Sequence, residues 1–130
     1  MGYVNTDGRA LQGLLLESLT AAENYARLSR CFSGWQAESL NRMAKESRAH
    51  GSCICGICAL VLGESPEKPL PLPDTGTVSI RLKKAYARAM HLLSAWEGYG
   101  ADPEYGPVFQ RLSIRQQDHC RKILEIIGCL

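Results

Sequence analysis

The feature that most constrains the fold is a spacing of apolar residues of about 3.6 positions, which recurs in four long segments of the chain. The segments cover residues 6–32, 36–63, 77–100 and 107–128. This spacing places the apolar side chains on one face of an α-helix. No segment of useful length has the two-residue alternation of a β-strand. The pattern predicts an all-α protein with four helices of similar length.

Each segment has one stripe of residues that we expect to face the core. Thr6 or Asp7 is the predicted N-cap of the first helix, and Gly63 is the predicted end of the second. Gly51 and Gly56 weaken the second helix by about 1 kcal/mol each relative to Ala. The four stripes contain Leu11, Leu14, Leu15, Ser18, Ala22, Tyr25 and Ser29; Leu40, Met43, Ser47, His50, Ile54, Ile57, Cys58 and Val61; Leu82, Ala85, Tyr86, Ala89, Leu93 and Trp96; and Phe109, Leu112, Gln116, His119, Ile123, Ile126 and Ile127.

The connections between the segments predict how the helices pair. Residues 64–76, "ESPEKPLPLPDTG", contain four prolines and are typical of an extended connection. The other two connections are short. We therefore expect a single domain of residues 1–130, with one helical hairpin at about residues 6–63 and a second at about residues 77–128. Two hairpins joined by a Pro-rich crossover make a four-helix bundle.

Length and charge limit the classes of partner. A chain of 130 residues suits one domain with a real core. The net charge is +2, and the densest basic run, Arg81–Arg88, has helical spacing. We interpret it as a solvated helix face and expect neither a nucleic-acid nor a membrane partner. We expect instead a homo-oligomer, with a dimer as the first choice, because bundles of this size often pair.

The same features predict a cytoplasmic protein. No apolar run reaches the roughly 18 residues that a membrane span needs, and the first residues lack the layout of a signal peptide. The six cysteines are then expected to be reduced thiols rather than a disulfide framework.

The two halves of the chain resemble each other, which predicts a duplicated hairpin. A shift of 69 residues places His119 on His50 and Leu112 on Met43. A shift of 71 residues places Trp96 on Tyr25 in the leading helices. The difference of two residues fits within the hairpin turns.

A duplicated hairpin with one inward histidine on its second and fourth helices resembles the ferritin-like superfamily. The segment "ADPEYGPVF…HC" and the aliphatic tail after it resemble the small rubrerythrin-related bundles, over nearly the whole chain. The resemblance implies a di-iron site with one carboxylate from each of the first and third helices. The second and fourth helices then each supply Glu-x-x-His. It also implies iron or manganese, and chemistry with oxygen or peroxide.

The positions that the resemblance assigns to four carboxylates do not carry acids in this chain. His50 and His119 match the two histidines, but Ser47 and Gln116 stand three residues before them. The positions on the first and third helices fall at Ser18 and Ala89.

Two interpretations of the histidines stay open. In the first, His50 and His119 are neutral core residues, hydrogen-bonded to neighbours such as Ser47 and Gln116. In the second, they form a remodelled metal site with Glu46, four residues before His50 on an edge of the same helix. Zinc or copper tolerates fewer carboxylates than a di-iron centre. His91 points away from its stripe and is predicted to lie on the surface.

Three cysteines follow His50 in a C-x-C-x-x-C pattern that is typical of metal sites on loops. On a helix, Cys53 lies about 90° to one side of the stripe and Cys55 about 110° to the other. The first interpretation is that these are small apolar-like side chains, with Cys58 in the core. The alternative is a copper or zinc binder with Cys53, Cys58 and Cys120 as ligands.

Three functions follow as expectations. The first is a ferritin-like protein whose di-iron site is lost or remodelled, and which is a metal-binding or structural module rather than an enzyme. The second is a rubrerythrin-like metal-dependent oxidoreductase that uses His50, His119 and Glu46. The third is the cysteine-based metal binder. The cofactor is accordingly iron, manganese, zinc or copper, or there is none.

Overall fold

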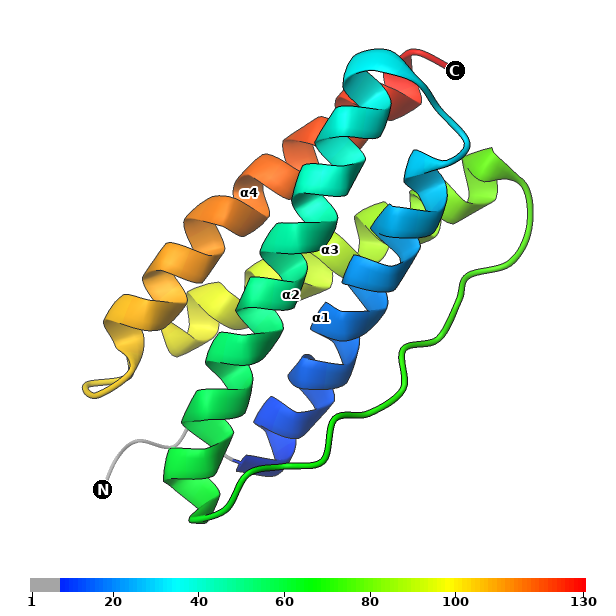
Figure 1. The fold of residues 1–130 in the computed structure, drawn as a ribbon. Coiled ribbons are helices and arrows are strands. Elements are labelled where there is room, and N and C mark those ends of the chain that lie inside the picture. Colours follow the sequence, from blue (N-terminus) through cyan, green and yellow to red (C-terminus); the bar gives the residue numbers. More distant parts are fainter. Residues whose placement is uncertain (1–7) are drawn as a thin grey trace.

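The computed structural model describes residues 8–130, and the N-cap predicted at Thr6 or Asp7 lies outside them. The described chain has four α-helices: α1 (Gly8–Ser29), α2 (Gly34–Leu62), α3 (Val78–Tyr99) and α4 (Gly106–Gly128). The helices α1 and α2 form one hairpin and α3 and α4 a second, and the two hairpins pack as a bundle (Figure 1). The predicted all-α class and the two hairpins are confirmed.

The ends of the helices follow from local hydrogen bonding. Gly63 has a φ of 83° and its N–H donates to the carbonyl oxygen of Ala59 at 2.9 Å, which ends α2 as predicted. The Thr77 side chain accepts a hydrogen bond from the Ile80 N–H at 3.2 Å and caps α3. The first helix ends at Ser29, three residues before the predicted end.

The turn between α3 and α4 is held by one carboxylate. Asp102 is buried, and its Oδ1 accepts from the N–H groups of Glu104 at 2.8 Å and Tyr105 at 2.9 Å. A short acidic side chain that bonds the backbone two or three residues ahead is a common way to fix a tight turn. It directs the chain into α4, whose first turn holds Pro107.

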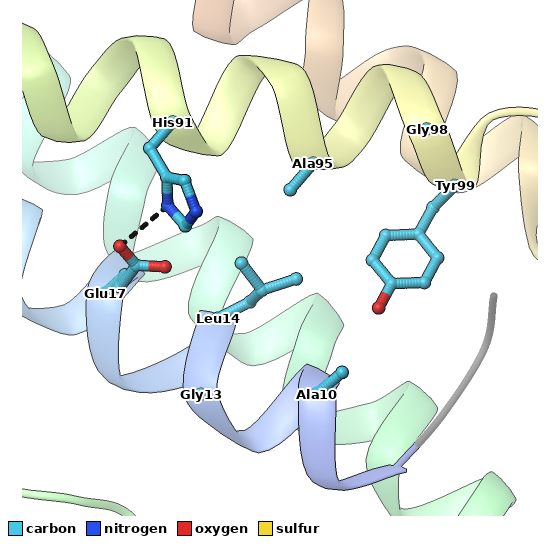
Figure 2. A pocket seen from close by; sticks show the side chains of 8 residues that line it. All are labelled: Ala10, Gly13, Leu14, Glu17, His91, Ala95, Gly98 and Tyr99. Carbon is cyan, nitrogen blue, oxygen red and sulfur yellow. Dashed lines mark hydrogen bonds and ion pairs between the residues drawn. The ribbon is translucent and has the colours of Figure 1, made fainter.

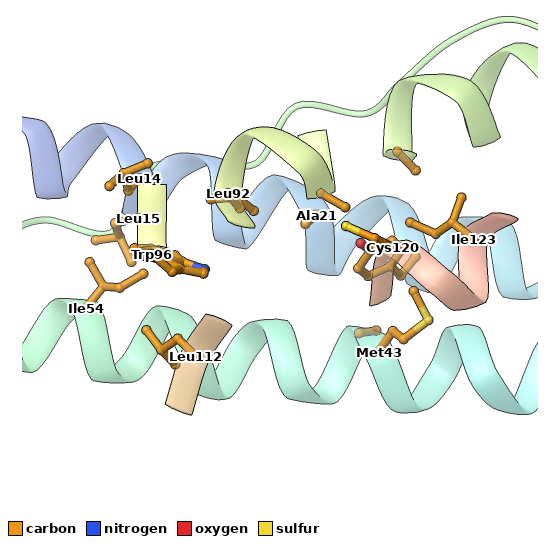
Figure 3. Close-up of a cluster of buried hydrophobic side chains, with 14 of the residues drawn as sticks. Leu14, Leu15, Ala21, Met43, Ile54, Leu92, Trp96, Leu112, Cys120 and Ile123 are labelled. Carbon is orange, nitrogen blue, oxygen red and sulfur yellow. The ribbon is translucent and has the colours of Figure 1, made fainter. Parts of the chain in front are cut away.

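The core lies between the two hairpins and follows the predicted stripes (Figure 3). Trp96, Tyr25 and Phe109 are among its largest fully buried side chains, and the rings of Trp96 and Phe109 stack with centroids 5.8 Å apart. Stripe positions on α2 and α3 differ from the prediction: Val61 is 37% exposed, and on α3 the fully buried leucine is Leu92, whereas the predicted Leu93 is only partly buried. Ile57 and Cys58, one turn earlier, are buried, so α2 loses its cover only in its last turn.

Residues 63–77 connect the two hairpins along the length of the bundle, beside α1 (Figure 1). Asn24 of α1 holds this segment: its Nδ2 donates to the carbonyl oxygen of Leu72 at 2.8 Å, and its Oδ1 accepts from the Asp74 N–H at 2.7 Å. Arg88 of α3 donates to Asp74 Oδ1 at 2.7 Å. The connection is therefore fixed to both hairpins. Among the described helices, none is long and apolar enough to cross a membrane.

Candidate functional site

The polar residues that the sequence places on the inward stripes all lie inside the bundle. Their exposed fractions range from 0% to 6%, so the predicted orientation of these positions is confirmed. They come from α1, α2 and α4, whereas α3 places the apolar Ala89 at the centre: the polar residues are Ser18, Ser47, His50, Gln116 and His119. The centre of the bundle is consequently polar but almost without charge.

One carboxylate reaches this centre, and it binds the histidine of the opposite hairpin. Glu46 Oε1 of α2 lies 2.7 Å from His119 Nε2 of α4. The His50 and His119 rings stack nearly parallel, at 18°, with centroids 5.8 Å apart. The Tyr25 ring meets His119 edge-on, with centroids 5.6 Å apart. We call Tyr25, Glu46, His50 and His119 the histidine cluster.

Both imidazoles of the cluster are neutral at neutral pH. Burial, and then the neighbouring His119, lowers the pKa of His50 to about 4. Burial also lowers the pKa of His119, although the hydrogen bond that His119 donates to Glu46 opposes that shift. A neutral imidazole has one N–H, and a carboxylate only accepts, so Nε2 of His119 carries the hydrogen and donates it to Glu46. The other nitrogen, Nδ1, is buried with a free lone pair and has no hydrogen-bond partner in the described chain.

The charge of Glu46 is also shared with two arginines. Its Oε2 lies 3.9 Å from Arg42 Nε and 3.7 Å from Arg115 Nη1. Arg42 also forms an ion pair with Asp118, in which Arg42 Nη2 lies 3.3 Å from Asp118 Oδ2. The Glu46 side chain is 21% exposed, so it joins the buried His119 to the surface between α2 and α4. A depression of about 300 Å³ lies there, lined by Glu46, Ala49, His50, Arg111, Leu112 and Arg115.

This set of residues does not fit a di-iron centre. Two ferrous ions need several carboxylates to balance their charge, and the matching positions hold Ser18, Ser47, Ala89 and Gln116. Within residues 8–130, no three or more His, Cys, Asp or Glu side chains are grouped to hold a metal ion. The one nearby acid, Glu46, is placed as the hydrogen-bond partner of a histidine.

Several other buried polar atoms at the centre have no partner in the described chain. They include Ser18 Oγ, Tyr25 OH, Trp96 Nε1 and Gln116 Nε2. Burial raises the pKa of Tyr25 well above its usual range, so the phenol stays protonated. Each of these groups can donate or accept a hydrogen bond.

The cysteines are not gathered at this centre. The helix α2 runs unbroken through Cys53, Cys55 and Cys58, of which the first is exposed and the last buried. All six cysteines of the chain are free thiols. Burial raises the pKa of Cys58 and of Cys120, so both are neutral thiols rather than the thiolates that bind metals. The geometry therefore offers no set of thiolate ligands from Cys53, Cys58 and Cys120.

A second concave site, which the sequence did not reveal, lies between α1 and α3 (Figure 2). It has a volume of about 550 Å³. His91 Nδ1 lies 2.8 Å from Glu17 Oε1 at one end, and Tyr99 stands at the other. His91 is exposed, as predicted. The signal for this groove was the presence of Gly13 and Gly98 inside amphipathic helices.

A partly buried ion pair was also not predicted from the sequence. The side chains of Arg88 and Asp74 are 15% and 10% exposed and join α3 to the segment before it. No periodicity marks a residue in an extended connection as the partner of a helix residue.

We compared the chain with models of protein families, with curated proteins and with solved structures, and found no match in any of the three. The assignment of function therefore depends on the geometry of the chain's own residues.

Proposed function

We propose that this protein is a ferritin-like bundle that has lost the di-iron centre and that works as a binding module rather than as an oxidoreductase. The observation that supports the proposal is the set of buried neutral residues, Ser18, Ser47, Ala89 and Gln116, at the four positions where such a centre needs carboxylates. An oxidoreductase of that kind needs metal-bound oxygen or peroxide, which in turn needs the missing acids.

The contacts of Glu46 support the same proposal. Its carboxylate contacts His119, Arg42 and Arg115. Because the two arginines already balance its negative charge, it is a poor counter-charge for a metal ion. The hydrogen bond fixes the His119 tautomer and ring orientation, which is a structural role. We infer that the histidine cluster now ties the two hairpins together through α2 and α4.

One observation favours a second candidate function, the binding of a single transition-metal ion. His119 Nδ1 has a free buried lone pair, and His50 is a neutral imidazole stacked on the same ring. A histidine that donates its other N–H to a carboxylate is a common form of metal ligand. In this candidate His50 and His119 bind the ion, and Glu46 orients His119. Zinc or copper suits such a set better than iron.

Metal content by mass spectrometry tests both functions, on protein purified without chelator and without a His-tag. The sample is incubated anaerobically with ferrous iron, and separately with zinc, and then desalted. We expect substoichiometric iron in the unmodified protein. The compared variant is His50→Ala/His119→Ala, and His91→Ala is the matched control on an exposed histidine.

The outcomes separate the functions. Two iron ions per chain, lost in the double variant and kept in His91→Ala, would contradict the loss of the di-iron centre. One zinc ion per chain with the same dependence would support the second candidate. Zinc that disappears only in Cys53→Ser/Cys58→Ser/Cys120→Ser would support a thiol site, against the geometry described above.

A further inference from the structure

The groove between α1 and α3 has the size and composition of a small-molecule site. Its volume of about 550 Å³ lies within the range of roughly 300 to 1,000 Å³ that is usual for ligand pockets. Most of its lining is apolar or small, with a few polar groups at its ends, which is also usual for such pockets. It shares no lining residue with the histidine cluster. The lining residues are Ala10, Gly13, Leu14, Glu17, His91, Ala95, Gly98 and Tyr99.

Two glycines in this groove are not required by the packing of the chain itself. A Cβ atom added to Gly13 or to Gly98 would meet no atom within 4 Å. By contrast, a Cβ at Gly51 would lie 3.1 Å from Leu19 Cδ2, so that glycine has a packing reason. A glycine inside a helix destabilises it by about 1 kcal/mol relative to alanine. Gly56 is equally open, but it does not line this groove, whereas Gly13 on α1 and Gly98 on α3 both do.

The two ends of the groove are closed by larger side chains. Figure 2 places His91 and Glu17 at one end and the Tyr99 ring at the other, with Leu14 and Ala95 between them. The Tyr99 ring stacks on Phe109, with centroids 4.9 Å apart, which holds it in place. A groove that accepts a helix is open at both ends, whereas this one has a bounded length. The open backbone at the glycines allows a flat molecule to approach both helices closely.

The end at Glu17 offers a hydrogen-bond acceptor. A carboxylate only accepts, so His91 Nδ1 donates to Glu17 Oε1 across 2.8 Å. A carboxylate has about four lone-pair sites, so Glu17 keeps the capacity to accept a further hydrogen bond. Its negative charge also favours a donor over an anionic group.

The surroundings of the groove favour a small molecule over a second protein chain. Of the large apolar side chains that stand exposed in the described chain, none lines the groove. The core of a protein interface needs such side chains, and a stable one buries roughly 800 Å² on each partner.

We propose that this groove binds a planar aromatic molecule of one or two rings that carries an N–H donor. The ring lies between α1 and α3, against the open backbone at Gly13 and at Gly98, and the N–H donates to Glu17. The inference goes beyond the proposed function, since it concerns a separate site and holds whether or not the histidine cluster binds metal.

Titration with indole tests the proposal, followed by amide chemical shifts of the full ¹⁵N-labelled chain. Indole is a flat two-ring molecule with one N–H, and 1-methylindole has the same rings without the donor. A fragment of this size is expected to bind with a Kd on the order of 1 mM. The shifts should concentrate on Gly13, Leu14 and Gly98, and 1-methylindole should bind several-fold more weakly.

Three variants and one control variant sharpen the test. Gly13→Leu and Gly98→Leu fill the groove and should raise the Kd of indole by about tenfold or more. Gly56→Leu is the matched control, because Gly56 is also an open helical glycine and lies on α2, away from the groove. Glu17→Ala should remove the preference for indole over 1-methylindole. Circular dichroism checks that each variant keeps its helices.

Several results would overturn the proposal. One is indole binding that is unchanged in both Gly13→Leu and Gly98→Leu. Another is a set of shifts centred on the histidine cluster instead of the groove. A third is a set of nuclear Overhauser contacts from residues 1–7 to Gly13 or Gly98 in the free protein, because the chain itself would then occupy the groove.

Discussion

At the scale of single residues, the decisive feature is the protonation of two buried histidines. His50 and His119 have exposed fractions of 6% and 0%, and the burial of each lowers its pKa. Of these two histidines, only His119 is hydrogen-bonded to Glu46. The cluster thus favours neutral imidazoles, and the folded protein becomes less stable as the pH falls.

The free energy of unfolding should therefore fall as the pH is lowered from about 6.5 to about 4. His50 has a folded pKa of about 4 and an ordinary value of 6.5, so in this window the unfolded chain binds a proton that the folded chain excludes. The loss is on the order of 3 kcal/mol for a shift of this size, and the lowered pKa of His119 adds in the same direction. Urea unfolding at a series of pH values measures it.

The comparison for this prediction is His50→Gln, which removes the titrating group and should flatten the pH dependence. The control is His91→Gln, which removes the exposed imidazole that bonds Glu17. An identical slope in His50→Gln and in the unmodified protein would contradict the assignment.

At the scale of elements, the long connection between the hairpins is held by a helix residue. Asn24 is 1% exposed, and its amide bonds Leu72 and Asp74 as well as the carbonyl oxygen of Thr20 at 2.9 Å. Residues 64–76 form neither helix nor strand, so these bonds satisfy backbone polar groups that regular secondary structure does not pair.

Replacing Asn24 by Ala should lower the free energy of unfolding by about 2 kcal/mol. The change removes two hydrogen bonds to the connecting segment, each with a net contribution of about 1 kcal/mol. The Asp74 amide should also exchange its hydrogen faster. Asn41→Ala on the exposed side of α2 is the matched control, and should stay within about 0.5 kcal/mol of the unmodified protein. Equal losses in both variants would contradict the role of Asn24.

At the scale of the whole molecule, the two hairpins share one core. Tyr25 of the first hairpin is 1% exposed and Trp96 of the second is 0% exposed. The contact between Glu46 and His119 joins α2 to α4, and the pair of Arg88 and Asp74 joins α3 to the connecting segment. Neither hairpin has a closed apolar core without the other.

Separate peptides of residues 8–63 and 77–130 should consequently be weakly helical alone and gain helicity when mixed. Each alone would expose its apolar face to water, and a chain of about 55 residues has little surface to bury. Circular dichroism of the single and mixed peptides measures the gain. A cooperative thermal transition in either peptide alone would contradict a shared core.

More of the fold than of the candidate site could be predicted from the sequence. The stripes placed Ser18, Ser47, His50, Gln116 and His119 inside the bundle correctly, because the rotation per residue fixes which side chains share a helix face. The partner of Glu46 could not be predicted in this way. It lies on another helix, 73 residues away in the chain, and depends on the distance between α2 and α4. The groove at Gly13 and Gly98 likewise depends on how α1 and α3 pack.

The sequence by itself determined four helices, their pairing into two hairpins, and the inward position of uncharged residues such as Ser18, Ser47 and Gln116. These properties depend on local periodicity and on residue identity, which the chain carries without folding. Only the tertiary structure decided that Glu46 binds His119, that Asn24 holds the connecting segment, and that Glu17, His91 and Tyr99 bound one groove. Those contacts join residues far apart in the chain, and only the packing of the helices brings them within reach of each other.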